Sequence, residues 1–152
     1  MSYSLETSIG YQTNLVATIL KTSFTKLIQP RFGIAAEQFA TLKIINEEQE
    51  ISQTKIAELL GKDKTTVGRS IESLIKKGLL KREECYIDKR ANRVSLTPEA
   101  KEILAGANKI AFQYNEGLKQ KITEKELEVY FKVLNTILQE SKNIELEIER
   151  GN

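Results

Sequence analysis

Two short helical segments lie almost end to end in the middle of the sequence. Residues 53–60 and 64–77 each place apolar side chains on one helical face, and about three residues separate them. Ser52 and Asp63 stand where N-caps are expected, and Gly61 stands where the first helix must stop. So short a connection forces the second helix to turn sharply against the first. This spacing constrains the fold more than any other feature of the chain.

A pair of short strands is expected directly after the two helices. Residues 79–86 and 93–97 have strand character, and in the second segment Val94 and Leu96 alternate with polar residues. The residues between them, 88–92, are polar and favour a turn. Two helices joined by a tight turn and followed by a hairpin define a winged helix-turn-helix.

The rest of the sequence is expected to be helical. Pro30 and Gly33 are expected to break the first flanking helix. Thr97 is placed to cap a helix that begins with proline, and Thr123 with Glu126 forms a capping box. The four flanking helices are expected at residues 12–28, 36–46, 98–120 and 124–148. The fold class is therefore mainly α with a small β-hairpin wing (α+β).

The flanking helices carry more apolar surface than a small core needs. Residues 12–28 and 124–138 each form a broad apolar stripe at helical spacing. We therefore expect a homodimer, in which 1–34 and 98–152 form a helical dimerisation region and 35–97 forms the winged helix-turn-helix domain. The alternative is that these helices fold back on their own domain.

Positive charge is concentrated in the same central region. Residues 61–93 hold ten basic and five acidic side chains, an excess of +5 in a chain whose net charge is only +2. Such a surface favours the phosphate backbone of duplex DNA as a partner. The plainer interpretation is a solvated charged face.

Composition excludes several classes of function. The chain has no histidine and one cysteine, Cys85, so an internal disulfide, a structural zinc site and a histidine-activated nucleophile are not expected. We expect no enzyme activity, metal or cofactor. No apolar run approaches the roughly 20 residues of a membrane span, and no signal peptide is evident, which favours the cytoplasm. Cys85 lies between opposing charges and is not expected to sense oxidants.

The sequence resembles the MarR family of transcriptional regulators. The resemblance rests on "DKRANRVSLT" at 88–97, which is similar to the family's wing signature, and on "KTTVGRSIESLIKKGLLKRE", which is similar to its recognition helix. Ala100 departs from a frequent glycine, and Ala35 from a frequent Thr or Ser cap. The resemblance implies a repressor that binds a palindromic DNA operator as a homodimer and is released by a small-molecule effector.

Polar and basic side chains on the second helix and on the hairpin tip are the expected DNA contacts. Arg69 is the best candidate for a guanine contact in the major groove or for a close phosphate, and Arg90 for the minor groove. Asp88 is expected to hydrogen-bond the tip backbone or to hold an arginine in place. An ordinary polar hairpin tip is the alternative. Gly68 permits close approach either to DNA or to a packed neighbour. The full set is Lys64, Thr65, Thr66, Arg69, Ser70, Ser73, Lys76, Asp88, Lys89 and Arg90.

The resemblance also implies a pocket for a small aromatic or anionic effector. Tyr11, Lys21, Arg31 and Phe32 are candidates to line it, although core or surface placement explains each of them equally well. The alternative to a DNA-binding regulator is a winged-helix protein-interaction module without sequence-specific DNA binding. In that case the basic side chains that engage an acidic partner are Lys76, Lys77, Lys81 and Arg82.

Overall fold

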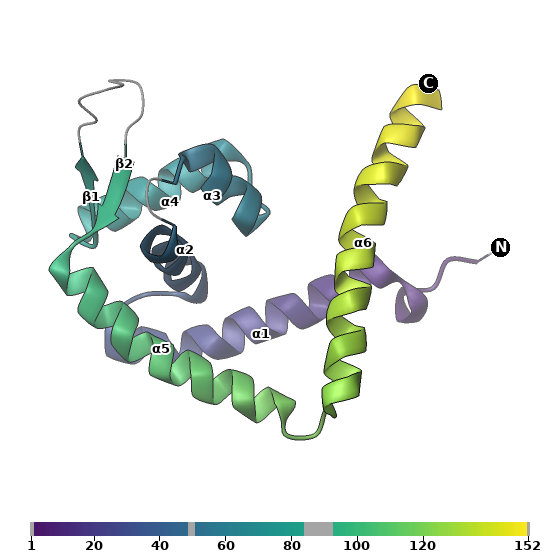
Figure 1. Ribbon diagram of the computed structural model, residues 1–152, viewed down its shortest axis with the longest axis horizontal. Helices are drawn as coiled ribbons and strands as arrows, with labels where there is room; N and C mark the ends of the chain where they lie inside the picture. Colours follow the sequence, from purple (N-terminus) through teal and green to yellow (C-terminus); the bar gives the residue numbers. More distant parts are fainter. Residues whose placement is uncertain (1, 49–50, 84–92, 152) are drawn as a thin grey trace. The chain divides into compact units, whose positions relative to one another are not determined.

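The computed structural model describes residues 2–48, 51–83 and 93–151. Its elements are η1 (Leu5–Thr7), α1 (Ile9–Phe32), α2 (Ala36–Glu47), α3 (Gln53–Leu60), α4 (Lys64–Lys76), β1 (Leu80–Glu83), β2 (Arg93–Leu96), α5 (Pro98–Lys119) and α6 (Glu124–Gly151). The chain divides into two compact units, Met1–Ala111 and Phe112–Asn152, with the boundary inside α5. The division into 35–97 and two flanking dimerisation segments stays a prediction. The mainly helical fold with a small hairpin is confirmed (Figure 1).

The tight turn between α3 and α4 forms as the sequence predicts. The Ser52 hydroxyl accepts a hydrogen bond from the Lys55 backbone N–H at 3.1 Å. Gly61 then ends α3 in the left-handed region, at φ 62°. One Asp63 carboxylate oxygen accepts the Thr66 backbone N–H at 2.9 Å and starts α4. Each cap satisfies a backbone donor that a helix leaves unpaired, so both helix starts are fixed locally.

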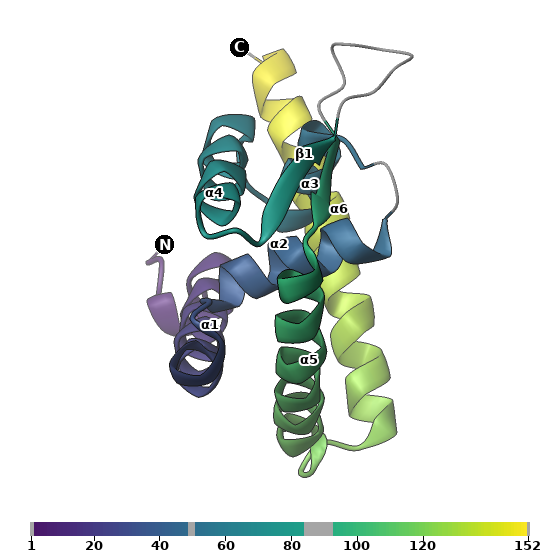
Figure 2. The same cartoon turned by 90° about the vertical axis from the view of Figure 1, so that its left-hand side faces the viewer.

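The strands form an antiparallel hairpin that packs on α4 (Figure 2). In its register Leu80 lies opposite Leu96, and Glu83 lies opposite Arg93. Both leucines are buried, so this pair fixes the hairpin against the helical core. The first strand was expected to run to residue 86, but residues 84–86 lie outside the described part of the chain.

The core of the first unit is built from the inward faces of these elements. Its fully buried side chains include Ile28 of α1, Leu42 of α2, Ile56 of α3 and Leu74 of α4. Burying such a side chain contributes about 1.5–3 kcal/mol. The amphipathic spacing of each helix therefore determines which face of α4 turns inward and which stays exposed.

The prediction that Pro30 breaks the first helix is wrong. α1 continues through Pro30 to Phe32. Pro30 lies in the last turn of α1. A proline there removes one backbone N–H donor, but few helical residues follow it, so the helix is not broken. Gly33 ends the helix instead, because it adopts φ 68° and donates its N–H to the Gln29 carbonyl.

The second unit consists of the end of α5 and the whole of α6. The predicted capping box is present: Glu126 N–H donates to the Thr123 hydroxyl at 3.2 Å, and Thr123 N–H donates to the Glu126 carboxylate at 2.8 Å. No residue of α6 is buried, although its apolar side chains include Phe131 and Leu138, each more than half exposed. Within the described residues, no helix combines the length and the apolarity that crossing a membrane requires.

Candidate nucleic-acid interface

The face of α4 that points away from the core carries four of the predicted DNA contacts. Val67, Ile71 and Leu74 are buried and fix the inward side of the helix. At 3.6 residues per turn the opposite side carries Thr65, Arg69, Ser73 and Lys76, all of which are exposed. The structure therefore presents these four side chains together on one accessible face.

Several basic side chains of this region already have partners within the protein. Lys62 pairs with Glu37 at 3.1 Å, and Lys81 lies 3.9 Å from Glu83. Arg82 pairs with Glu72. Lys77 donates to the Gly33 carbonyl at 3.1 Å and to the Gln38 side chain at 3.2 Å. The number of basic side chains in this segment therefore overstates how many of them are available to a partner.

Three cations on α4 are different. In the described part of the chain, no carboxylate pairs with Lys64, Arg69 or Lys76. Lys64 stands at the first position of the helix, Arg69 in its middle and Lys76 at its end. Because no carboxylate of the described residues compensates their charge, these three cations are available to an external anion.

Thr66 and Ser70 lie on the flank of α4 rather than on its outermost face. The Thr66 hydroxyl donates to an Asp63 carboxylate oxygen at 2.6 Å, and this bond, with the backbone N–H of Thr66, lowers the pKa of Asp63. Thr66 is exposed, but its hydroxyl hydrogen is engaged by Asp63 rather than offered to DNA. Ser70 is half-buried.

Gly68 makes room for a neighbouring side chain. A Cβ atom built on Gly68 would lie 2.8 Å from Nε2 of Gln53, the first residue of α3. That nitrogen donates to the Lys64 carbonyl at 3.1 Å. Of the two explanations for this glycine, the structure supports the packed neighbour.

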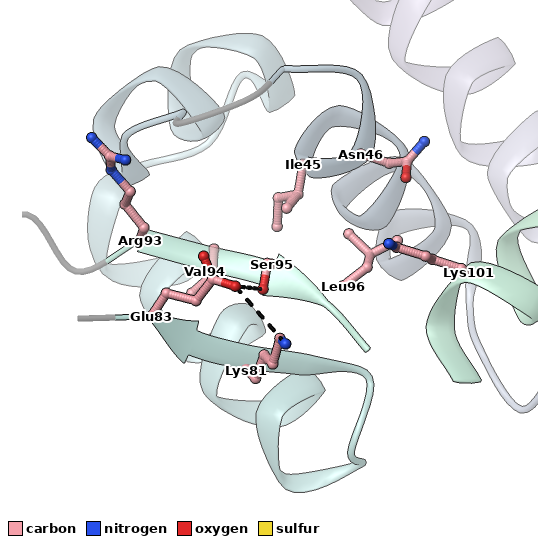
Figure 3. Close-up of a pocket in the computed structure, with 9 residues that line it drawn as sticks. All are labelled: Ile45, Asn46, Lys81, Glu83, Arg93, Val94, Ser95, Leu96 and Lys101. Carbon is pink, nitrogen blue, oxygen red and sulfur yellow. Dashed lines mark hydrogen bonds and ion pairs between the residues drawn. The ribbon is translucent and has the colours of Figure 1, made fainter. Parts of the chain in front are cut away.

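A cavity of about 350 Å³ lies at the base of the hairpin, beside the end of α2 and the start of α5 (Figure 3). Within it, the Ser95 hydroxyl donates to Glu83 at 2.9 Å, and Lys81 lies nearby. Because successive residues of a strand point to opposite faces, Lys81 and Glu83 lie on one face of β1 while Arg82 turns to α4 on the other.

Three of the predicted contacts cannot be placed. Asp88, Lys89 and Arg90, on the expected wing tip, lie outside the described residues, as does Cys85. Their proposed roles stay predictions. Within the described ranges, no group of three or more acidic, cysteine or histidine side chains is placed to hold a metal ion.

The candidate effector residues are only partly brought together. Lys21 lines a cavity of about 250 Å³ between α1, α2 and the start of α4, whereas Tyr11 and Arg31 are exposed on α1 and do not line it. The Phe32 ring instead packs on Gly106 of α5, where a Cβ atom would lie 2.5 Å from the ring. Phe32 is thus a packing residue of the first unit.

Glu37, at the same cavity, is a residue that the sequence did not single out. Lys62 and Lys21 both pair with its carboxylate, at 3.1 and 3.2 Å. The hydrogen bond from Lys62, followed by that from Lys21, holds the pKa of Glu37 below its usual value of 4.5, although partial burial opposes this. One carboxylate therefore links α1, α2 and the turn before α4.

The fold and this surface define a winged helix-turn-helix protein. The model of the MarR family matches residues 34–91, which span α2, the helix-turn-helix and β1 and end before β2. Residues 34–91 therefore match the winged-helix domain of the MarR family, and solved structures of MarR-family transcriptional regulators share the fold.

Solved structures agree over nearly the whole chain. A MarR transcriptional regulator from Methanosarcina mazei Go1 is 26% identical, with a TM-score of 0.74, over 90% of this chain and 97% of its own. A MarR/EmrR family regulator from Acinetobacter sp. ADP1 is 22% identical, with a TM-score of 0.86, over 93% and 99%. The S. aureus MepR–DNA complex is 22% identical, with a TM-score of 0.80, over 90% and 99%.

Proposed function

We propose that this protein is a sequence-specific double-stranded-DNA-binding regulator that acts in the cytoplasm as a homodimeric repressor. The observation that carries the proposal is the cations of α4: Arg69 and Lys76 on its outward face and Lys64 at its start have no acidic partner among the described residues. The major groove admits one helix, and a cationic helix face beside a hairpin fits the groove and the flanking phosphates. That MepR was solved with DNA supports this proposal.

Exposed apolar side chains on the flanking helices support a dimer. They include Val16 and Ile19 on α1 and Phe131, Leu138 and Ile148 on α6. A helix with this many large exposed apolar side chains more often forms an interaction surface than remains exposed to solvent. A two-fold dimer places two α4 helices about one turn of DNA, roughly 34 Å, apart, which suits a palindromic operator.

The cavity beside α4 supports release by a small effector. Ala36, Ala40, Leu60 and Val67 give it apolar walls, and its polar side holds Glu37 with its two partners, Lys21 and Lys62. Apolar walls with a few polar groups suit a small aromatic or anionic molecule. Because this cavity borders the first turns of α4, a molecule bound there would shift the helix that we propose contacts DNA.

Selection of bound sequences from a random duplex pool tests the DNA-binding proposal directly. We expect enrichment of one palindromic site, and an affinity for it that falls steeply as salt rises. Enrichment of no sequence, together with salt-insensitive binding, would contradict it and favour the protein-interaction alternative. That alternative has less support, because Lys77, Lys81 and Arg82 have partners inside the protein.

A further inference from the structure

The exposed face of α4 carries one carboxylate among its cations. Glu72 lies three residues after Arg69 and four before Lys76, and side chains at these spacings meet on a helix surface. In the structure Glu72 pairs instead with Arg82 of β1, and both side chains are partly exposed. Arg82 of the hairpin therefore pairs with the carboxylate that Arg69 and Lys76 of α4 would otherwise pair with.

We propose that Arg82 is a positioning residue for DNA binding, which holds Glu72 on the hairpin and so leaves Arg69 and Lys76 unpaired. The inference rests on the proposed DNA-binding function. Without Arg82, the Glu72 carboxylate turns to Arg69 or Lys76 and withdraws that cation from DNA. Whenever it is paired with neither cation, it faces the phosphates as an uncompensated negative charge, which they repel.

The geometry of β1 makes Arg82 suitable for this role. Leu80 is buried, so Arg82, two residues along the strand, points to the same side and reaches α4. Figure 2 shows the hairpin and α4 next to each other. A guanidinium offers a planar set of donors that matches a carboxylate better than the single ammonium group of a lysine.

Lys81 provides a matched control. It precedes Arg82 in the same strand, carries the same charge and pairs with Glu83 on the opposite face (Figure 3). Lys81→Ala therefore removes one positive charge near the interface without releasing Glu72. Its effect measures the general contribution of net charge to DNA affinity.

The test is a double-mutant cycle on a duplex that the parent protein has selected from a random pool. We expect Arg82→Ala to weaken binding roughly three- to tenfold, because the released Glu72 pairs with Arg69 or Lys76 and that cation no longer contacts DNA. Glu72→Gln breaks the same pair but removes the competing carboxylate, so binding should not weaken. The double variant should bind within about twofold of Glu72→Gln. Lys81→Ala should weaken binding less than Arg82→Ala, and a thermal melt of each variant checks folding.

Each contrary result identifies another role for Arg82. If Glu72→Gln weakens binding as much as Arg82→Ala, the pair only fixes the hairpin. If the double variant stays as weak as Arg82→Ala, Arg82 itself contacts DNA. If Lys81→Ala equals Arg82→Ala, only net charge matters. Any of these overturns the proposal.

A second measurement needs no DNA. In Arg82→Ala, either the Nε–Hε NMR signal of Arg69 or the Nζ signal of Lys76 should shift, and it should return to its original position in the double variant, because Glu72 reaches these cations only in the first. If neither signal shifts, the exchange of partners is overturned. If the parent selects no duplex, the proposed DNA-binding function fails, while the NMR result still decides whether Glu72 changes partner.

Discussion

At the scale of single residues, Arg69 is the side chain of α4 that we propose contacts a base. It lies near the middle of the exposed face, and among the described residues no carboxylate neutralises it. We expect Arg69→Ala to weaken operator binding more than binding to random DNA, by about 1–3 kcal/mol of discrimination per contact. Fluorescence titrations with the selected duplex and a scrambled duplex give the two affinities. Equal losses on both would make Arg69 a phosphate contact only.

Glu37 gives a second residue-scale prediction, in the pH dependence of stability. Its pKa in the folded protein lies below the usual 4.5, mainly because Lys62 donates to it. A lowered folded pKa stabilises the protein above the unfolded value, and this contribution disappears as the pH falls through the folded value. The melting temperature of Glu37→Gln should therefore lie below that of the parent at pH 7. The difference should shrink as the pH falls below about 4.5.

Glu58→Gln is the control for that titration. Glu58 pairs with Lys55 three residues away on the exposed side of α3, with the carboxylate side chain 63% exposed. Such a pair contributes little, so its removal should change the melting temperature less than Glu37→Gln does. A Glu37→Gln difference that persists unchanged at pH 3 would show that the carboxylate charge is not the cause.

At the scale of elements, the contact between the end of α1 and α5 rests on one glycine. The Phe32 ring lies where a Cβ atom on Gly106 would be, at 2.5 Å. An aromatic ring between two helices has little room to move, so Gly106→Ala should destabilise the protein by about 1–3 kcal/mol. Phe32→Leu combined with Gly106→Ala should recover part of this loss. Chemical denaturation of the parent, both single variants and the double variant measures it, and additive effects would contradict the close contact.

The elements that the sequence predicted best are those fixed by neighbouring residues. Ser52, Asp63 and the Thr123–Glu126 box cap their helices through bonds that span three residues, so a short stretch of sequence contains the whole interaction. The prediction at Pro30 was wrong, because the effect of a proline depends on how many helical residues follow it, and here α1 ends at Phe32.

The partners of the basic side chains were not predictable in the same way. Lys77 donates to a carbonyl 44 residues earlier, and Lys62 pairs with a carboxylate of α2. Sequence spacing shows neither contact, because both depend on how distant elements pack. The candidate surface was therefore found from the sequence, but which of its cations stay available was not.

At the scale of the whole molecule, the apolar face of α6 predicts self-association. Phe131 and Leu138 are two turns apart on one side of the helix and are 56% and 54% exposed. Phe131→Asp with Leu138→Asp should convert the protein from dimer to monomer and weaken operator binding strongly, since two half-sites are no longer held together. Thr136→Asp, on another side of the helix, is the control. Light scattering at micromolar concentration gives the mass, and a parent protein that is monomeric and well folded would contradict the dimer.

The internal partners of Lys62, Lys77, Lys81 and Arg82 also set a limit on the thermodynamics of DNA binding. Each phosphate that a protein neutralises releases condensed counterions, and the slope of log K against log salt concentration is about −0.9 per phosphate. With these four of its ten central cations engaged within the protein, fewer than ten central cations per protomer, and fewer than twenty per dimer, remain for this exchange. The slope should then be shallower than the value of about −18 that twenty available cations would allow. We therefore expect the DNA affinity of the protein to depend on ionic strength less than the number of basic residues in its sequence suggests.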